Sequence, residues 1–144
     1  MSGVGAALAG GRWNSRGRQA IYTADSLASA ALEVLVHLEG GLPAGSYVAA
    51  EVQVDDDLPL LSMPPNRLPV GWDSVPADAS SVGFGDEWLA QAETVGLIVP
   101  SVIVRGHKNV VLNPAHERFA EISVIDVQPF TFDRRLLFRL SPPR

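Results

Sequence analysis

Two stretches of the chain show the clearest periodic patterns of apolar and polar positions. Residues 26–39 read SLASAALEVLVHLE, with apolar side chains recurring every three or four positions, so they predict an amphipathic helix. Asp25 or Ser26 can cap the start of this helix, and the Gly40–Gly41 pair can end it. Apolar side chains recur at every second position within residues 46–54, and this period of two predicts a half-buried strand.

The other apolar segments are shorter and mostly rich in strand-forming residues. Residues 97–104 are almost wholly apolar, which is typical of a buried strand. A short helix is predicted over residues 87–95, with Asp86 as its cap and Gly96 at its end. Strands are also predicted at residues 19–23, 109–112, 122–127 and 129–140, and a helical turn with Asn113 as its cap and Pro114 as its first residue.

The order of these elements predicts a mixed α+β domain with more strand than helix. At 144 residues and 15.3 kDa, the chain is expected to form one domain spanning residues 1–144. Residues 58–85 contain many Pro and Gly residues without a regular period, so they predict a long structured loop. Two interpretations of that loop stay open: it carries function, or it is packing filler.

Composition excludes several classes of function. The chain has no Cys, so disulfides, thiolate zinc sites and a thiol nucleophile are excluded. The net charge of -5 argues against a nucleic-acid partner, because phosphates would be repelled. No apolar run approaches the ~18 residues that span a bilayer, so we expect a cytoplasmic protein. A mean hydropathy of +0.14 is high for a small soluble monomer and suggests a covered surface.

Common catalytic and nucleotide-binding motifs are absent or incomplete. Gly5 and Gly10 have P-loop spacing, but Gly11 and Arg12 stand where Lys and Ser or Thr are required. The chain has neither a complete dinucleotide-binding glycine motif nor a nucleophile elbow. Its three His residues are too scattered to suggest a metal site, so no bound metal is expected.

Three features stand out. Arg12, Arg16 and Arg18 lie on a Gly-rich segment with Trp13, which suits a pyrophosphate but also fits a solvated basic loop.

Ser29, Glu33 and His37 fall on one line of the predicted helix, where Glu33 either faces a cleft or belongs to a narrow solvent stripe. Ser101 places a hydroxyl in the most apolar strand, and taken alone it is better explained by a strand irregularity or bulge.

Taken in order, several short motifs carry a resemblance that covers nearly the whole chain. They are Gly11–Asn14 (GRWN), Ile21–Thr23 (IYT), Ala31–His37 (ALEVLVH), Pro100–Val102 (PSV), Asn113–Pro114 with His116, and Phe132–Leu136 (FDRRL). The set resembles the RES domain family, named for an Arg, a Glu and a Ser that would here be Arg12, Glu33 and Ser101. Within the family, the chain is most similar to the ParT-like toxins.

The resemblance implies a fold similar to bacterial ADP-ribosyltransferases of the diphtheria-toxin group. It also implies a toxin of a type II toxin–antitoxin module, paired with an Xre-like antitoxin that covers the active site. The toxin would then form either a homo-oligomer or a hetero-oligomer with this antitoxin. ParT-like members use NAD as co-substrate to ADP-ribosylate phosphoribosyl pyrophosphate synthetase, whereas others hydrolyse or phosphorolyse NAD. Family members commonly have another strand before the GRWN motif, whereas this chain begins almost at that motif, so either its start is truncated or this member lacks that edge.

The chemistry of NAD cleavage fits these residues, because breaking the nicotinamide–ribose bond passes through an oxocarbenium-like state that needs no metal. Glu33 would stabilise the positive charge, Arg12 would neutralise the pyrophosphate and Tyr22 would stack on nicotinamide. His37 would orient Glu33 or contact ribose, and Ser101 and Asn113 would help to bind NAD. ADP-ribosyl transfer is the leading hypothesis, with NAD hydrolysis or phosphorolysis and a non-enzymatic interaction module as alternatives.

Overall fold

The fold is described from a computed structural model, which covers residues 1–38, 47–133 and 135–136. A four-stranded sheet with the order β1-β5-β4-β3 forms its centre. The strands are β1 (Ile21–Ala24), β3 (Leu60–Ser62), β4 (Gly96–Pro100) and β5 (Lys108–Leu112). β1, β5 and β4 pair antiparallel, and β3 pairs parallel with β4. The parallel pair is possible because residues 63–95, which include α3, connect its strands.

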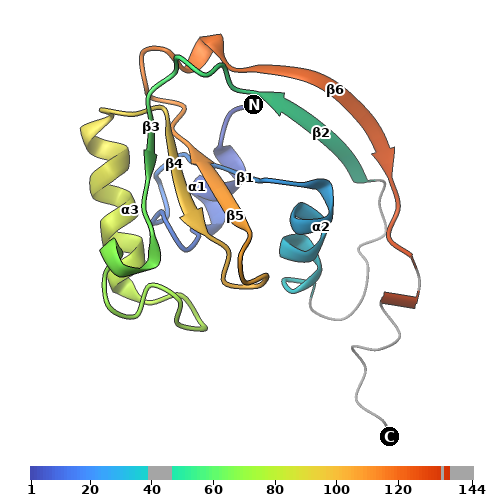
Figure 1. The fold of residues 1–144 in the computed structure, drawn as a ribbon, viewed down its shortest axis with the longest axis horizontal. Coiled ribbons are helices and arrows are strands. Elements are labelled where there is room, and N and C mark those ends of the chain that lie inside the picture. Colours follow the sequence, from blue (N-terminus) through green and yellow to red (C-terminus); the bar gives the residue numbers. More distant parts are fainter. Residues whose placement is uncertain (39–46, 134, 137–144) are drawn as a thin grey trace, which may run out of the picture.

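A second sheet consists of two antiparallel strands, β2 (Tyr47–Gln53) and β6 (Ser123–Phe130). These strands form a long ribbon that arches away from the central sheet, above α2 (Figure 1). The strands predicted at residues 122–127 and 129–140 are one strand that continues through Pro129. Proline is tolerated there because, within the described residues, β6 pairs with β2 alone and leaves its other edge unpaired. Residues 131–133 are not strand, and residues 137–140 lie outside the described part.

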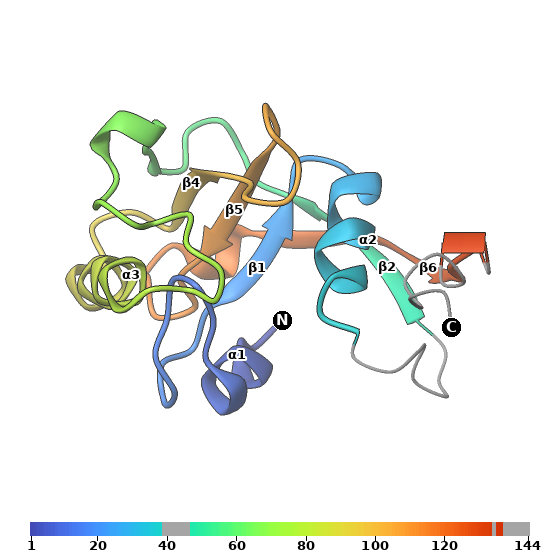
Figure 2. The ribbon, with the colours of Figure 1, turned by 90° about the horizontal axis from the view of Figure 1, so that it is seen from below.

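Three α-helices surround the central sheet: α1 (Val4–Ala9), α2 (Leu27–Leu35) and α3 (Ala79–Gln91). Viewed from below, α3 lies on one side of β4 and β5, while α2 lies beyond β1 (Figure 2). The predicted helix over residues 26–39 is shorter than expected. Ser26 caps α2 by accepting the backbone N–H of Ser29, and Val36 is its C-cap. The Gly40–Gly41 pair lies outside the described residues.

The helix predicted over residues 87–95 was placed wrongly. α3 begins at Ala79, about two turns before the predicted start, and ends at Gln91. Its cap is Asp78, whose Oδ1 accepts the N–H of Ser80 at 2.7 Å. The first half of α3 is rich in Ser and Gly, which have low helix propensity, so the sequence did not predict it as helical.

Two other predicted segments differ from the structure. β4 ends at Pro100 rather than at Val104, because the backbone N–H of Ser101 bonds to the carbonyl of His107 and closes a loop. Asn113 caps a single turn by accepting the N–H of Ala115, and no helix follows directly. α1 was not predicted at all. The long predicted loop over residues 58–85 contains β3, a short 3-10 helix (Pro65–Arg67) and the start of α3.

The core has two parts, one on each face of the central sheet. On one face, Trp88 and Leu89 of α3 pack against Leu97, Val99 and Val111. On the other face, a smaller cluster is formed by Leu58, Val95, Leu112 and Ile122. None of the helices in the described residues has the length and hydrophobicity that crossing a membrane requires.

Candidate active site

One face of the central sheet brings several of the predicted residues together. Tyr22 is paired with the core residue Val111, and Asn109 with the core residue Val99. Because directly paired residues point to the same side of a sheet, Tyr22 and Asn109 lie on the face that α3 covers. Ser101 directly follows the last residue of β4. Glu33 comes from α2, which lies beyond β1 (Figure 2).

Glu33 is held by residues far away in the sequence. Its Oε1 accepts a hydrogen bond from Ser101 Oγ at 3.0 Å and another from Asn109 Nδ2 at 2.6 Å. The side chain is half-buried at this junction of α2 with the ends of β4 and β5. A half-buried carboxylate fixed in this way is suited to meet a developing positive charge.

Arg12 points its guanidinium at the segment after the Pro65–Arg67 turn. Its Nη1 donates to the carbonyls of Trp72 at 2.7 Å and Ser74 at 2.8 Å. Both N–H groups of Nη1 are therefore used, and the three donors on Nε and Nη2 remain for a ligand. Burial lowers the pKa of Arg12, while the negative charge of Glu33 partly opposes that shift. Arg12 and Glu33 are thus close enough to interact electrostatically.

Tyr22 has a fixed hydroxyl and an accessible ring. The hydroxyl donates to Asn14 Oδ1 at 2.7 Å and accepts the backbone N–H of Trp13 at 2.9 Å. Burial raises the pKa of Tyr22 to about 12, so the hydroxyl is neutral at pH 7. With 41% of its surface exposed, Tyr22 still offers its ring for stacking. Gly11 allows this arrangement, because a Cβ there would collide with the Tyr22 hydroxyl.

A family model for the RES domain matches residues 1–133. The chain belongs to the RES domain family. It is 43% identical over 141 residues to a "Prs ADP-ribosylating toxin" of Sphingobium sp. (strain YBL2), covering 95% of this chain and 86% of that protein. It is 39% identical over 137 residues to a "Toxin Res" of Yersinia enterocolitica, covering 94% and 89%. The resemblance found in the sequence is therefore confirmed.

The fold of this RES domain is also found among solved structures. It aligns with a chain of the crystal structure of the M. tuberculosis MbcT–MbcA toxin–antitoxin complex with a TM-score of 0.61, over 91% of this chain and 77% of that chain. The sequence identity is 22%, so this likeness concerns the fold alone. The expected mixed α+β fold is confirmed.

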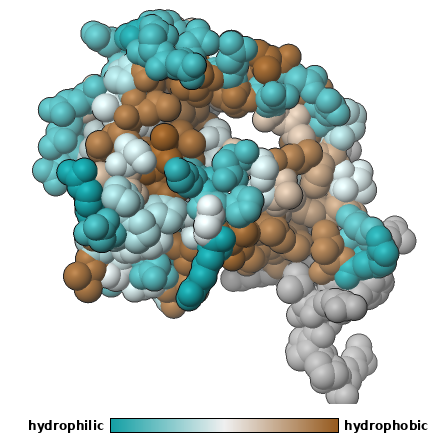
Figure 3. All heavy atoms as spheres, viewed as in Figure 1, coloured by the Kyte–Doolittle hydropathy of each residue, from teal (hydrophilic) through white to brown (hydrophobic). Residues whose placement is uncertain are grey.

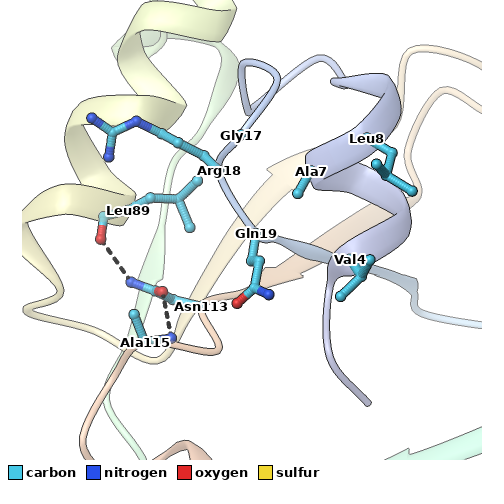
Figure 4. Close-up of a pocket in the computed structure, with 9 residues that line it drawn as sticks. All are labelled: Val4, Ala7, Leu8, Gly17, Arg18, Gln19, Leu89, Asn113 and Ala115. Carbon is cyan, nitrogen blue, oxygen red and sulfur yellow. Dashed lines mark hydrogen bonds between the residues drawn. The ribbon is translucent and has the colours of Figure 1, made fainter.

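Within this RES domain, the predicted cluster of three arginines is divided. Arg18 lies 3.6 Å from Asp86 and lines a shallow, open depression of about 480 Å³ with residues of α1 (Figure 4). Arg16 is exposed and donates to the carbonyl of Ala9 at 3.4 Å. Trp13, on the same segment, belongs to the core: only 3% of it is exposed, and it stacks on Trp72.

Two predicted site residues make no hydrogen bond to Glu33 within the described part of the chain. Asn113 sits at the opposite end of β5 from Asn109, roughly 13 Å away at ~3.3 Å per residue. Its side chain donates to the carbonyl of Leu89 and accepts the N–H of Ala115, beside the depression (Figure 4). His37 is exposed just beyond the end of α2, and among the described residues its side chain has no hydrogen bond. The proposed roles of both stay predictions.

Sequence reasoning missed Asn109 and a neighbouring group at the start of α2. His107 Nδ1 lies 3.0 Å from Ser29 Oγ and 3.1 Å from Asp25 Oδ1. Hydrogen bonds from His107 and from the Lys108 N–H lower the pKa of Asp25. Ser29 and Asp25 contact the same nitrogen, so this trio lacks the relay geometry of a nucleophilic triad. It fastens α2 to the loop that carries Ser101. Among the described residues there is no cluster suited to a metal ion.

Proposed function

We propose that this chain is the toxin of a toxin–antitoxin pair and that it transfers ADP-ribose from NAD to a protein. The observation that carries the proposal is the Glu33 carboxylate, fixed by two donors and within electrostatic range of Arg12. Relatives named "Prs ADP-ribosylating toxin" and "Toxin Res" support it. The target proposed here is phosphoribosyl pyrophosphate synthetase.

The residues divide the chemistry among them. The C1′–N bond of NAD breaks, its electron pair leaves with nicotinamide, and the Glu33 carboxylate stabilises the positive charge on the ribose. An acceptor side chain then bonds to C1′ and loses its proton. Arg12 offers its remaining donors to the pyrophosphate, and the exposed ring of Tyr22 stacks on nicotinamide.

The experiment is to incubate the protein with NAD labelled in its adenylate half and with cell extract. We expect label on one protein band, and a Glu33→Gln variant should release nicotinamide at least ~100-fold more slowly, since the charge that stabilises the transition state is gone. Glu51→Gln is the matched control, because Glu51 is an exposed glutamate on β2. Full activity of the Glu33→Gln variant would contradict the site assignment.

The same experiment separates the other candidate functions. Label that accumulates as free ADP-ribose or ADP-ribose phosphate, with no labelled protein, would identify an NAD hydrolase or phosphorylase. No consumption of NAD at all would favour a non-enzymatic interaction module.

The proposal includes a partner. We infer an Xre-like antitoxin that covers the edge carrying Arg12 and Glu33, because an NAD-consuming enzyme must be silenced in its own host. The exposed apolar side chains on α2 and the ribbon, including Val36, Val48 and Val127, support a covered surface.

A further inference from the structure

The hydroxyl of Ser101 has no hydrogen-bonding capacity left for a ligand. Its oxygen accepts the backbone N–H groups of Ile103 at 3.2 Å and Val104 at 3.0 Å. Its single proton is donated to Glu33 Oε1 at 3.0 Å. A serine hydroxyl has one donor and two acceptor positions, so all three are used inside the protein. Only 5% of Ser101 is exposed.

Asn109 reaches the same carboxylate oxygen from the neighbouring strand. Its Nδ2 lies 2.6 Å from Glu33 Oε1, while its Oδ1 is buried and has no hydrogen-bond partner among the described residues. The reverse orientation of the amide would set two oxygens against each other at this distance, so Glu33 fixes the orientation. A buried acceptor without a partner lowers the stability of the fold, so the presence of Asn109 at this position needs an explanation.

The two contacts together leave the carboxylate asymmetric. Oε1 accepts both hydrogen bonds, whereas Oε2 has no hydrogen-bond partner among the described residues. A carboxylate held at one oxygen by two donors, one from β5 and one from the loop after β4, has a fixed direction. The oxygen that remains is the one able to face a substrate.

We propose that Ser101 and Asn109 are positioning residues that together clamp Oε1 of Glu33, and that Oε2 is the oxygen that faces the reacting ribose. This clamp rests on the proposed cleavage of NAD. It replaces the expectation that Ser101 itself binds NAD, and it assigns a role to Asn109. A positioning residue alters the chemical step, whereas a residue that binds NAD alters its affinity.

The test at Ser101 compares two substitutions of equal size, Ser101→Thr and Ser101→Val, of which only Thr keeps the hydroxyl. We measure nicotinamide release for kcat and the dissociation constant of NAD by calorimetry. The clamp predicts that Val lowers kcat roughly tenfold to hundredfold, as loss of a hydrogen bond to a charged group does, while the dissociation constant stays within about twofold. Thr should retain most of the wild-type kcat. A weaker affinity for NAD with unchanged kcat in the Val variant would overturn the proposal.

Asn109→Leu is the second variant, because it keeps the approximate shape and removes both the donor and the unpaired acceptor. The clamp predicts a kcat at least ~10-fold lower, an unchanged affinity for NAD and a melting temperature that does not fall. A merely structural asparagine would instead lose thermal stability and keep its kcat, and that result would overturn the assignment.

Failure of the clamp can be told from failure of the proposed function. If the wild-type protein neither binds nor cleaves NAD, the proposed function fails. The clamp is then judged from crystal structures of the two variants at position 101. Glu33 should keep its orientation with Thr and change it with Val. The same Glu33 orientation in both variants would overturn the clamp.

Discussion

At the scale of single residues, Tyr22 combines two tasks in one side chain. Its hydroxyl joins the buried side chain of Asn14 to the backbone of Trp13, which shapes the turn that carries Arg12. The side chain nevertheless remains partly exposed. The two tasks can be separated, because phenylalanine keeps the ring and removes only the hydroxyl.

Replacement of Tyr22 by Phe should therefore lower the free energy of unfolding by ~1–3 kcal/mol, since the buried partners of the hydroxyl are left unpaired. The pH dependence gives a second signature. The folded protein holds the Tyr22 proton up to a pKa of about 12, whereas an unfolded tyrosine loses it near pH 10. Between these values the unfolded state binds fewer protons, so wild-type stability falls as pH rises.

The measurement is urea unfolding of both proteins at several pH values from 8 to 12. The difference in stability between wild type and the Tyr22→Phe variant should shrink above pH 10. A difference that stays constant across this range would contradict a buried neutral hydroxyl, and weaker NAD binding by the variant would show that the hydroxyl also contacts the ligand.

A candidate site residue could be recognised from the sequence only where its polarity differed from that of its neighbours in the chain. Glu33 was predictable because a lone carboxylate interrupts an apolar helix. Asn109 was missed because an asparagine at the start of a short strand looks like ordinary turn polarity. The saturation of the Ser101 hydroxyl could not be predicted, since the backbone groups that fill it belong to a loop that the sequence indicated as strand.

At the scale of elements, the contact between α3 and the Arg12 segment explains a glycine that weakens the helical pattern. The backbone of Trp13 rests directly on Gly85, and a Cβ at that position would collide with the Trp13 carbonyl. The low helix propensity of Gly85 is therefore a requirement of packing. By contrast, β1, β2 and β5 were predicted nearly within their bounds, because alternation and β-branched residues coincide there.

Two alanine substitutions in the same helix test this contact. Gly85→Ala should destabilise the protein by several kcal/mol, because backbone must move to admit the methyl group. Gly83→Ala is the control: it meets no atom within 4 Å and should be neutral or stabilising by up to ~1 kcal/mol through helix propensity. Thermal unfolding of both variants gives the comparison, and equal effects would contradict the close approach of Trp13.

At the scale of the whole molecule, part of the exposed apolar surface lies on the arched ribbon. Figure 3 shows apolar atoms around an opening between the arched ribbon and the body of the domain. The ribbon strands β2 and β6 expose Val48 by 64% and Val127 by 57%. The alternating pattern of residues 46–54 predicted a half-buried strand in this ribbon. It does not encode how far the ribbon extends from the core, because that is a property of the tertiary structure.

The proposed antitoxin makes a prediction at this scale. In a purified complex of the chain with its Xre-like antitoxin, NAD should bind at least ~10-fold more weakly than to the chain alone, because the edge bearing Arg12 and Glu33 is covered. Calorimetric titration of NAD into the complex and into the free chain measures this. Undiminished NAD binding in the complex would mean that the antitoxin covers the ribbon instead and leaves the site open.

The sequence separations within the Glu33 cluster bear on when activity can arise. Glu33 is bonded to residues 68 and 76 positions later in the chain. During synthesis, the carboxylate therefore stays unconstrained until β4 and β5 have left the ribosome and paired. A nascent chain that carries Arg12, Tyr22 and Glu33 alone has no assembled site. The proposed activity is therefore silent throughout most of translation, which gives the proposed partner time to meet the chain before the site is assembled.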